Sequence, residues 1–319
     1  MDSYIVGIDI GGTKLSTVVA DGNGKILQKV RKPTESEKGP QHAVRLLLEM
    51  VDETIHLAGL KRADISGIGV SCGGPLDTKT GVVYSPPNLP GWDALPLKEL
   101  IEAEFHIPTI IENDANASAL AEWRFGGGRG YNYVLYMTMS TGIGGGIVAN
   151  GQVYHGANDS AGEVGHQILL PTGPLCGCGK RGCLEALCSG PAIARRAQAA
   201  IREHPQTQLL ALADGQIDRV RSEHVLEAAR NRDALALSLI NETAYYMGWG
   251  IANLVNILNP EIVLIGTIAV AAGDLLLDPI RRTVAEMAMQ RPAEAVRIMP
   301  AQLGDSVGDL AAIALVMKG

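Results

Sequence analysis

The chain has 319 residues, of which 46% are hydrophobic, and its formal net charge is -7 at pH 7. This length is long for one hydrophobic core and sufficient for two domains. The acidic balance and the lack of a long Lys/Arg cluster argue against a nucleic-acid partner. The apolar stretch 262–273 is too short to span a bilayer, and residues 1–10 lack the basic start of a secretory signal. Because most of the 5 cysteines lie in one short segment, we expect a cytoplasmic protein rather than a disulfide-bonded one.

Two segments of the chain share one layout. Residues 4–27 predict a strand, a Gly-rich turn, a second strand, another turn and a third strand. Residues 133–154 predict the same series. Gly-rich hairpins also occur in unrelated antiparallel sheets, so one copy is weak evidence. Two copies favour a duplicated domain with a ligand held between the halves.

The segments around these copies alternate between helix and strand patterns, which is typical of an α/β protein with a largely buried sheet. The Gly-rich residues 126–130 interrupt the apolar pattern and predict a domain boundary. Helices are predicted at 40–59, 97–105, 115–125, 191–204, 223–232, 234–257, 275–289 and 306–317, and further strands at 65–71, 109–112, 261–265 and 295–299.

The Gly-rich turns are candidate phosphate sites. In the first, Gly11 and Gly12 let backbone amides approach phosphate oxygens, and Thr13 adds a hydroxyl donor. Asp9 is placed to hold Mg²⁺ through water. The second turn, residues 138–146, reads TMSTGIGGG and offers further donors, so the pair fits a triphosphate. The spacing matches neither a Walker A loop nor GxGxxG, and purely structural turns remain an alternative.

Asp114 lies where a predicted strand passes into a helix. Asp is a good helix N-cap, but a carboxylate at the carboxyl end of a parallel strand is also well placed as a general base. The pattern leaves both possibilities open. The loops 73–75 and 88–92 either present polar groups to a hydroxylated ligand or only turn the chain.

One His and three Cys gather at the spacing of metal ligands. These residues, His166, Cys176, Cys178 and Cys183, form the S₃N donor set that suits tetrahedral zinc. A disulfide with a spare thiol is the alternative, and the nearby His disfavours it. The other two cysteines, at 72 and 188, have no partner at ligand spacing and are expected to be small buried residues.

Taken together, these motifs resemble the ROK family of repressors and sugar kinases, and in particular its glucokinase branch. The resemblance implies a duplicated actin-like, hexokinase-type (ribonuclease H-like) α/β fold with two domains around a cleft. The domains would be residues 1–125 joined by the C-terminal helix 305–319, and residues 126–304 with the zinc knuckle. The motifs that carry the resemblance are residues 9–14, 73–75, 88–92, 112–116, 138–146, 162–166 and 176–185.

The resemblance implies ATP-dependent phosphorylation of a hexose, most directly glucose, at the 6-hydroxyl. Asp114 would be the general base, with an ordinary pKa near ~4, and would take the proton late. The cofactors would be ATP, Mg²⁺ and a structural zinc, with His166 binding zinc through one ring nitrogen and the sugar through the other. The implied sugar-binding residues are Gly74, Asn88, Asn113, Asp114, Glu163, His166 and Glu185. The implied nucleotide-binding residues are Asp9, Gly11, Gly12, Thr13, Lys14, Thr138, Thr141, Gly142 and Gly266.

Two segments depart from the family pattern. Residues 265–269 replace a Gly-rich turn beside the adenosine, and Asp309 and Leu310 precede the small residues of the last helix. Both segments belong to the implied nucleotide pocket, so a phosphoryl donor other than ATP remains an alternative. Alternative functions are a kinase for N-acetylmannosamine or another amino sugar, a broad hexose kinase, and a non-catalytic sugar sensor. A repressor is disfavoured because the first strand starts at Tyr4. We expect a homo-oligomer, either a dimer or a tetramer, and no membrane partner.

Overall fold

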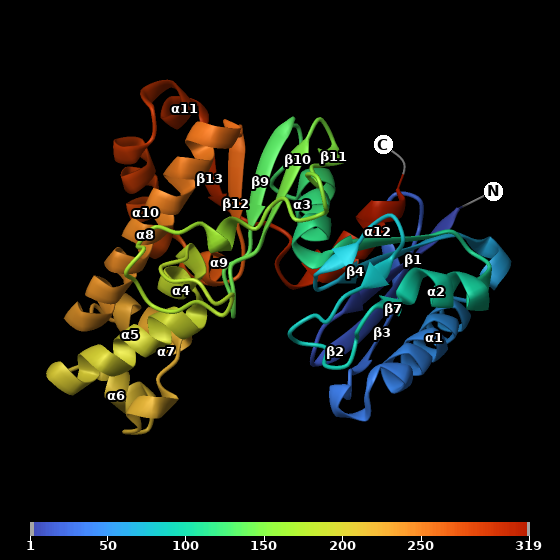
Figure 1. Cartoon of the computed structure of the whole chain (residues 1–319), viewed down its shortest axis with the longest axis horizontal. Helices are drawn as coiled ribbons and strands as arrows, with labels where there is room; N and C mark the ends of the chain where they lie inside the picture. Colours follow the sequence, from blue (N-terminus) through green and yellow to red (C-terminus); the bar gives the residue numbers. More distant parts are fainter. Residues whose placement is uncertain (1–2, 318–319) are drawn as a thin grey trace. The chain divides into compact units, whose positions relative to one another are not determined.

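The computed structural model describes residues 3–317. Its first sheet has five strands in the order β3-β2-β1-β4-β8 (Figure 1). Strand β1 is antiparallel to β2 and parallel to β4, and β8 extends the parallel part. The strands are β1 (Tyr4–Ile10), β2 (Lys14–Ala20), β3 (Ile26–Pro33), β4 (Ile65–Cys72) and β8 (Thr109–Asn113).

Helices cover both faces of this sheet, which explains why β1 and β4 are apolar on both sides. On one face, α1 (Pro40–Leu57) and α2 (Leu97–Phe105) pack over Ile8 and its neighbours in one core. On the other face, α12 (Val307–Val316) packs through Ile313 against β1 and β2. Helix α3 (Asp114–Phe125) lies beside α12 (Figure 1).

Strand β4 approaches α12 more closely than a side chain would allow. A Cβ atom added at Gly69 would lie 1.9 Å from the carbonyl oxygen of Ala312. Glycine at this position therefore lets the helix backbone rest on the sheet.

The second five-stranded sheet repeats the order of the first, as β11-β10-β9-β12-β13. Strands β12 and β9 are parallel, β12 and β13 are parallel, and β10 and β11 form a hairpin. The same order in both sheets is the duplication predicted from the two Gly-rich repeats. Its strands are β9 (Tyr133–Met137), β10 (Gly145–Ala149), β11 (Gln152–Val153), β12 (Ile262–Ile265) and β13 (Arg297–Pro300).

Most helices of the second half pack around α8 (Ala234–Leu258), the longest of the described helices. The Asp233 side chain caps its start by accepting a hydrogen bond from the Ala236 amide. Helix α10 (Asp274–Met287) lies along α8 (Figure 1). The other helices are α4 (Leu184–Cys188), α5 (Gly190–Glu203), α6 (Gln208–Leu212), α7 (Ser222–Arg230), α9 (Ile268–Ala272), α10 (Asp274–Met287) and α11 (Gln290–Ala295).

Every predicted helix and long strand is present in the structure, with ends within a few residues of those expected. The predictions omitted α4, α6, α9 and α11, which are only five or six residues long and therefore show too little periodicity to detect. They also omitted a small sheet of β5 (Leu76–Asp77), β6 (Val82–Val83) and β7 (Leu95–Pro96). Short 3₁₀ turns occupy Ser36–Lys38, Arg62–Asp64, Val164–His166, Ile217–Arg219 and Gly304–Ser306.

The chain divides into two compact units. The first comprises residues 1–130, 146–162 and 305–319, and the second comprises residues 131–145 and 163–304. Among the helices that the structure describes, none combines the length and apolar character that crossing a membrane requires.

Candidate active site and metal centre

In the first unit, the carboxyl end of β8 passes directly into α3 and carries Asn113 and Asp114. Asn113 is the N-cap, because its Oδ1 accepts hydrogen bonds from the amides of Ala115 (2.9 Å) and Asn116 (3.4 Å). Asp114 is the first residue of the helix. The capping role considered for Asp114 therefore belongs to its neighbour, and the Asn113 amide group lies against Gly74.

The Asp114 carboxylate is accessible to solvent, yet protein atoms surround it closely. Desolvation raises its pKa, and hydrogen bonding to the Ala115 amide only partly offsets this. The expectation of an ordinary pKa near ~4 was therefore wrong. The sequence shows neighbours along the chain, whereas this shift comes from atoms that the fold packs around the side chain.

The first Gly-rich turn, residues 11–14, is closed by a hydrogen bond from the Gly11 amide to the Lys14 carbonyl (3.0 Å). The Thr34 hydroxyl donates to the Gly11 carbonyl (2.6 Å), which holds the turn from outside. Asn88 packs against Gly12 so closely that an added Cβ would lie 2.5 Å from the Asn88 carbonyl oxygen. Thr13 and Lys14 are exposed.

Asp9 is half-buried at the end of β1, just before this turn. Its pKa is raised to about 6, mainly by burial and also by the nearby carboxylates Asp309 and Asp114, while the ammonium groups of Lys14 and Lys29 act in the opposite direction. A bound cation would stabilise the ionised form of a carboxylate whose charge is disfavoured in this way. The donor chemistry therefore fits the Mg²⁺ expected here.

In the second unit, Ser140 and Thr141 of the second Gly-rich turn line a pocket of about 460 Å³. The Ser140 amide donates to the Gly142 carbonyl (2.9 Å), and the Ser140 carbonyl accepts from the amide of Gly190 at the start of α5 (2.8 Å). The pocket thus joins the predicted phosphate turn to a helix N-terminus. Its lining includes Ser140, Thr141, Gly190, Pro191, Arg195, Gln198, Arg221, Ser222, Glu223, Thr267 and Ile268.

The segment that departs from the family pattern also lines this pocket. Thr267 has φ 53° and ψ -103°, a conformation that favours glycine and strains a β-branched residue. Its hydroxyl lies 3.2 Å from the Thr138 hydroxyl, and Gly266 packs against the Tyr136 ring. Thr267 therefore links two residues that are predicted to bind the nucleotide, Thr138 and Gly266. The sequence did not identify Arg195, Arg221 or the other α5 and α7 residues, because their pattern is that of an ordinary amphipathic helix.

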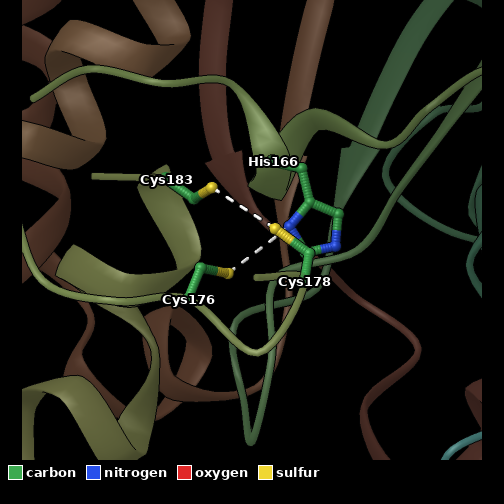
Figure 2. A group of neighbouring side chains, drawn as sticks. All are labelled: His166, Cys176, Cys178 and Cys183. Carbon is green, nitrogen blue, oxygen red and sulfur yellow. Dashed lines mark hydrogen bonds between the residues drawn. The ribbon is translucent and has the colours of Figure 1, made fainter. Parts of the chain in front are cut away.

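The four predicted metal ligands come together in the second unit, with their side chains pointing toward one another (Figure 2). The ligand atoms of His166, Cys176, Cys178 and Cys183 all lie within 4.8 Å of one another. The Cys178 and Cys183 sulfurs are 3.7 Å apart, close to the ~3.8 Å edge of a tetrahedron with 2.3 Å zinc–sulfur bonds. The described residues contain no disulfide, so the alternative pairing is not found, and Cys72 and Cys188 are buried as expected.

The two nitrogens of His166 face different partners. Nδ1 lies 3.7 Å from the Cys176 sulfur, whereas Nε2 lies 3.8 Å from a Glu163 carboxylate oxygen. Burial raises the pKa of Cys176 to about 12, while hydrogen bonding to the Lys180 amide lowers the pKa of Cys178. The ring is thus oriented with one nitrogen toward the sulfurs and the other toward a polar group.

Glu185 connects the metal centre to the second Gly-rich turn. Its Oε2 accepts a hydrogen bond from the Ile143 amide (3.0 Å), and its Oε1 lies 3.4 Å from the Cys176 sulfur. This side chain therefore touches both features that the sequence singled out in this unit.

The sequence pattern that defines the ROK family matches residues 5–319. The chain belongs to the ROK family. A glucokinase of Halalkalibacterium halodurans is 39% identical over 308 residues, which are 96% of this chain and 93% of that protein. The solved structure of a Streptomyces griseus ROK glucokinase in complex with glucose and AMPPNP has a TM-score of 0.82 and 34% identity, and the match covers 99% of this chain and 100% of that one. The expected actin-like, hexokinase-type fold is confirmed.

This ROK chain also resembles regulators within the same family. A xylose repressor of Caldicellulosiruptor bescii is 29% identical over 98% of this chain and 78% of that protein. The fold therefore serves both kinases and regulators, and function has to be argued from the site.

Proposed function

We propose that this protein is an ATP-dependent glucokinase that transfers the γ-phosphoryl group to the 6-hydroxyl of glucose. The observation that carries the proposal is the likeness, over nearly the whole chain, to a ROK glucokinase solved with glucose and AMPPNP. The glucokinase relative at 39% identity supports it as well.

The residues proposed to bind glucose offer both donors and acceptors. Asn113 uses its Oδ1 for the helix cap, so its amide nitrogen is the group left for a sugar hydroxyl. His166 has Nε2 directed away from the sulfurs, and Glu163 and Glu185 supply carboxylate oxygens. Gly74, Asn88 and Asp114 complete the proposed set.

Asp114 is proposed as the general base. The sugar oxygen forms a bond to the γ-phosphorus, the bond from that phosphorus to the bridging oxygen of ADP breaks, and the hydroxyl proton passes to an Asp114 carboxylate oxygen. The raised pKa makes this carboxylate a better proton acceptor than an ordinary Asp. It remains far too weak to ionise an alcohol beforehand, so the proton moves late.

The two Gly-rich turns are proposed to bind the ATP phosphates, through residues 11–14 and through Thr138, Thr141 and Gly142. The pocket of about 460 Å³ beside the second turn is proposed for the nucleoside, and Gly266 directly precedes Thr267 in its lining. Mg²⁺, when bound, would neutralise phosphate charge. Asp9 would hold it, and its raised pKa supports that assignment.

Zinc is proposed for the Cys₃His centre, as a structural ion. The S₃N donor set and the spacing of its ligand atoms fit tetrahedral zinc. Its binding would fix the tautomer and orientation of His166, so that Nε2 is presented in one direction. The free thiols of this centre also suit a reducing compartment, and we place the protein in the cytoplasm. A homo-oligomeric state stays a prediction.

Steady-state kinetics with purified protein tests the proposal. ADP formation is measured with ATP and glucose, and compared with N-acetylmannosamine, N-acetylglucosamine and xylose, and with polyphosphate as donor. Asp114→Asn should lower kcat by at least ~10²-fold, the lower range for a positioned base. Asp64→Asn, which changes an exposed carboxylate in the same unit, is the matched control and should keep the wild-type rate. Preference for an amino sugar, or no sugar-dependent ADP formation, would reject the glucokinase assignment.

A further inference from the structure

A buried carboxylate lies directly before the proposed base. Glu112 is the next-to-last residue of β8 and is 4% exposed. Its Oε1 accepts hydrogen bonds from the Asn113 amide (2.9 Å) and from the Asn116 side-chain amide (3.1 Å). One carboxylate oxygen therefore bridges the strand end and the first turn of α3, and Asp114 lies between the two residues that it contacts.

The other oxygen of this carboxylate is bound by a histidine from a distant part of the chain. His155 Nε2 lies 2.6 Å from Glu112 Oε2. His155 follows β11 and begins the loop 155–162, which lies in the same unit as β8 and α3. A buried carboxylate needs such a partner, because an unpaired buried charge is strongly destabilising.

The loop that carries His155 is held at further points within this unit. The Ala161 amide donates to the His155 carbonyl (3.1 Å), which closes the loop on itself. Asp159 accepts hydrogen bonds from the amide and the hydroxyl of Thr78 (both 3.1 Å). Thr78 follows the Gly74 segment that is proposed to contact the sugar. The loop is thus hydrogen-bonded both to the carboxylate before the proposed base and to a residue that follows a proposed sugar-binding segment.

We propose that His155 is a positioning residue that, through Glu112, fixes the Asn113–Asp114 segment for reaction with the sugar hydroxyl. The inference rests on the proposed glucokinase function. His155 does not touch the reacting atoms in this assignment. It acts by holding the carboxylate on which the strand end and the helix start converge.

The pair also predicts a dependence on pH. The hydrogen bond to Glu112 raises the pKa of His155, and the charge of Asp159 adds to this, while partial burial acts against it. Among the described residues, these two carboxylates are the charged groups that act on the imidazole. Because the pKa is raised, the charged pair is complete below the ordinary pKa of ~6.5 and weakens as pH rises through the raised value.

Kinetics of matched variants tests the role. His155→Ala should raise the glucose KM or lower kcat. We expect kcat/KM for glucose to fall by roughly 10-fold or more, which is the effect of losing one charge-assisted hydrogen bond. The ATP KM should stay within about twofold. His155→Gln keeps an amide donor for Glu112, so it should restore most of the activity and remove the alkaline decline in kcat/KM. His42→Ala is the control, because it removes a similar histidine–carboxylate pair (His42 Nε2 to Glu35 Oε2, 2.7 Å) elsewhere in the same unit.

Two results would overturn the inference: His155→Ala with wild-type kcat/KM for glucose, or His155→Gln with an unchanged pH profile. A purely structural role would lower the melting temperature without changing either readout. If the wild-type protein does not phosphorylate glucose, the proposed function fails and a second measurement decides this inference. Hydrogen exchange of the Ala115 and Asn116 amides should then be faster in His155→Ala than in wild type and His42→Ala, and equal rates would reject the positioning role.

Discussion

At the scale of single residues, Asp114 combines an accessible carboxylate with surroundings that disfavour its charge. Its folded pKa lies above the unfolded value, so the native state loses stability as pH rises from the unfolded pKa of ~3.9 through the raised value. At pH 7 the ionised side chain therefore costs stability. Active sites commonly hold groups of this kind, whose charge is needed for reaction rather than for folding.

We expect Asp114→Asn to be inactive yet more stable than wild type at pH 7. The difference in melting temperature should shrink as pH falls through the raised pKa, because the wild-type side chain then becomes neutral as well. In the wild-type enzyme, kcat/KM should decline on the acid side at a higher pH than an ordinary Asp would cause. Thermal unfolding and kinetics across pH check both. Asp218→Asn, at an exposed side chain, is the control, and a destabilised Asp114→Asn would contradict the argument.

Single residues also show how far the sequence predicts the site. The Cys₃His centre could be predicted because its ligands are close together in the sequence. The bond between His155 and Glu112 joins residues 43 apart, and no spacing rule indicates it. The sequence shows Thr267 only as a departure from a Gly-rich turn, whereas its strained backbone and its place in the pocket are visible only in the structure. Long-range contacts and desolvation are properties of the fold, and for that reason the pKa of Asp114 was misjudged.

At the scale of elements, the seam between β4 and α12 depends on the absence of a side chain at Gly69. We expect Gly69→Ala to destabilise the protein by ~3 kcal/mol, the upper end for overpacking, because the opposing atom is a backbone carbonyl oxygen that cannot move alone. Gly22→Ala is the matched control, since its added Cβ would make only an ordinary contact (3.5 Å to Ser3 O). Denaturant unfolding measures the stability of both variants. Equal unfolding midpoints would show that α12 does not pack against β4 as closely as the added-Cβ distance indicates.

The knuckle of residues 166–185 gives a second prediction at this scale. Purified protein should contain zinc, and Cys178→Ser should lose it, because three ligands hold the ion less well than four. Loss of zinc should raise the glucose KM by roughly 10- to 100-fold through the freed His166 ring. Elemental analysis and kinetics provide the readouts. Cys72→Ala, which changes a buried thiol outside the knuckle, should retain zinc. Zinc retained in Cys178→Ser would reject the ligand assignment.

At the scale of the whole molecule, ligand binding and catalysis should be separable. Glucose at 100 times its Kd should add ~2.7 kcal/mol to the stability of the wild-type protein, by mass action. Asp114→Asn should keep a similar gain, because the other proposed sugar contacts remain. Differential scanning calorimetry with glucose, and with xylose as the comparison sugar, measures this. A variant with no gain would mean that the Asp114 carboxylate supplies most of the glucose-binding free energy, and that the other proposed sugar contacts do not.

The first compact unit is assembled from three stretches, the last of which begins at Asp305. Helix α12 in that stretch covers the sheet face that carries Gly69. A ribosome that has synthesised residue 130 still needs roughly 9 to 35 s to reach residue 305, at ~5–20 residues per second. During that interval the nascent sheet has one uncovered apolar face. We therefore expect the amino-terminal half to expose more apolar surface to chaperones during translation than it does in the folded protein.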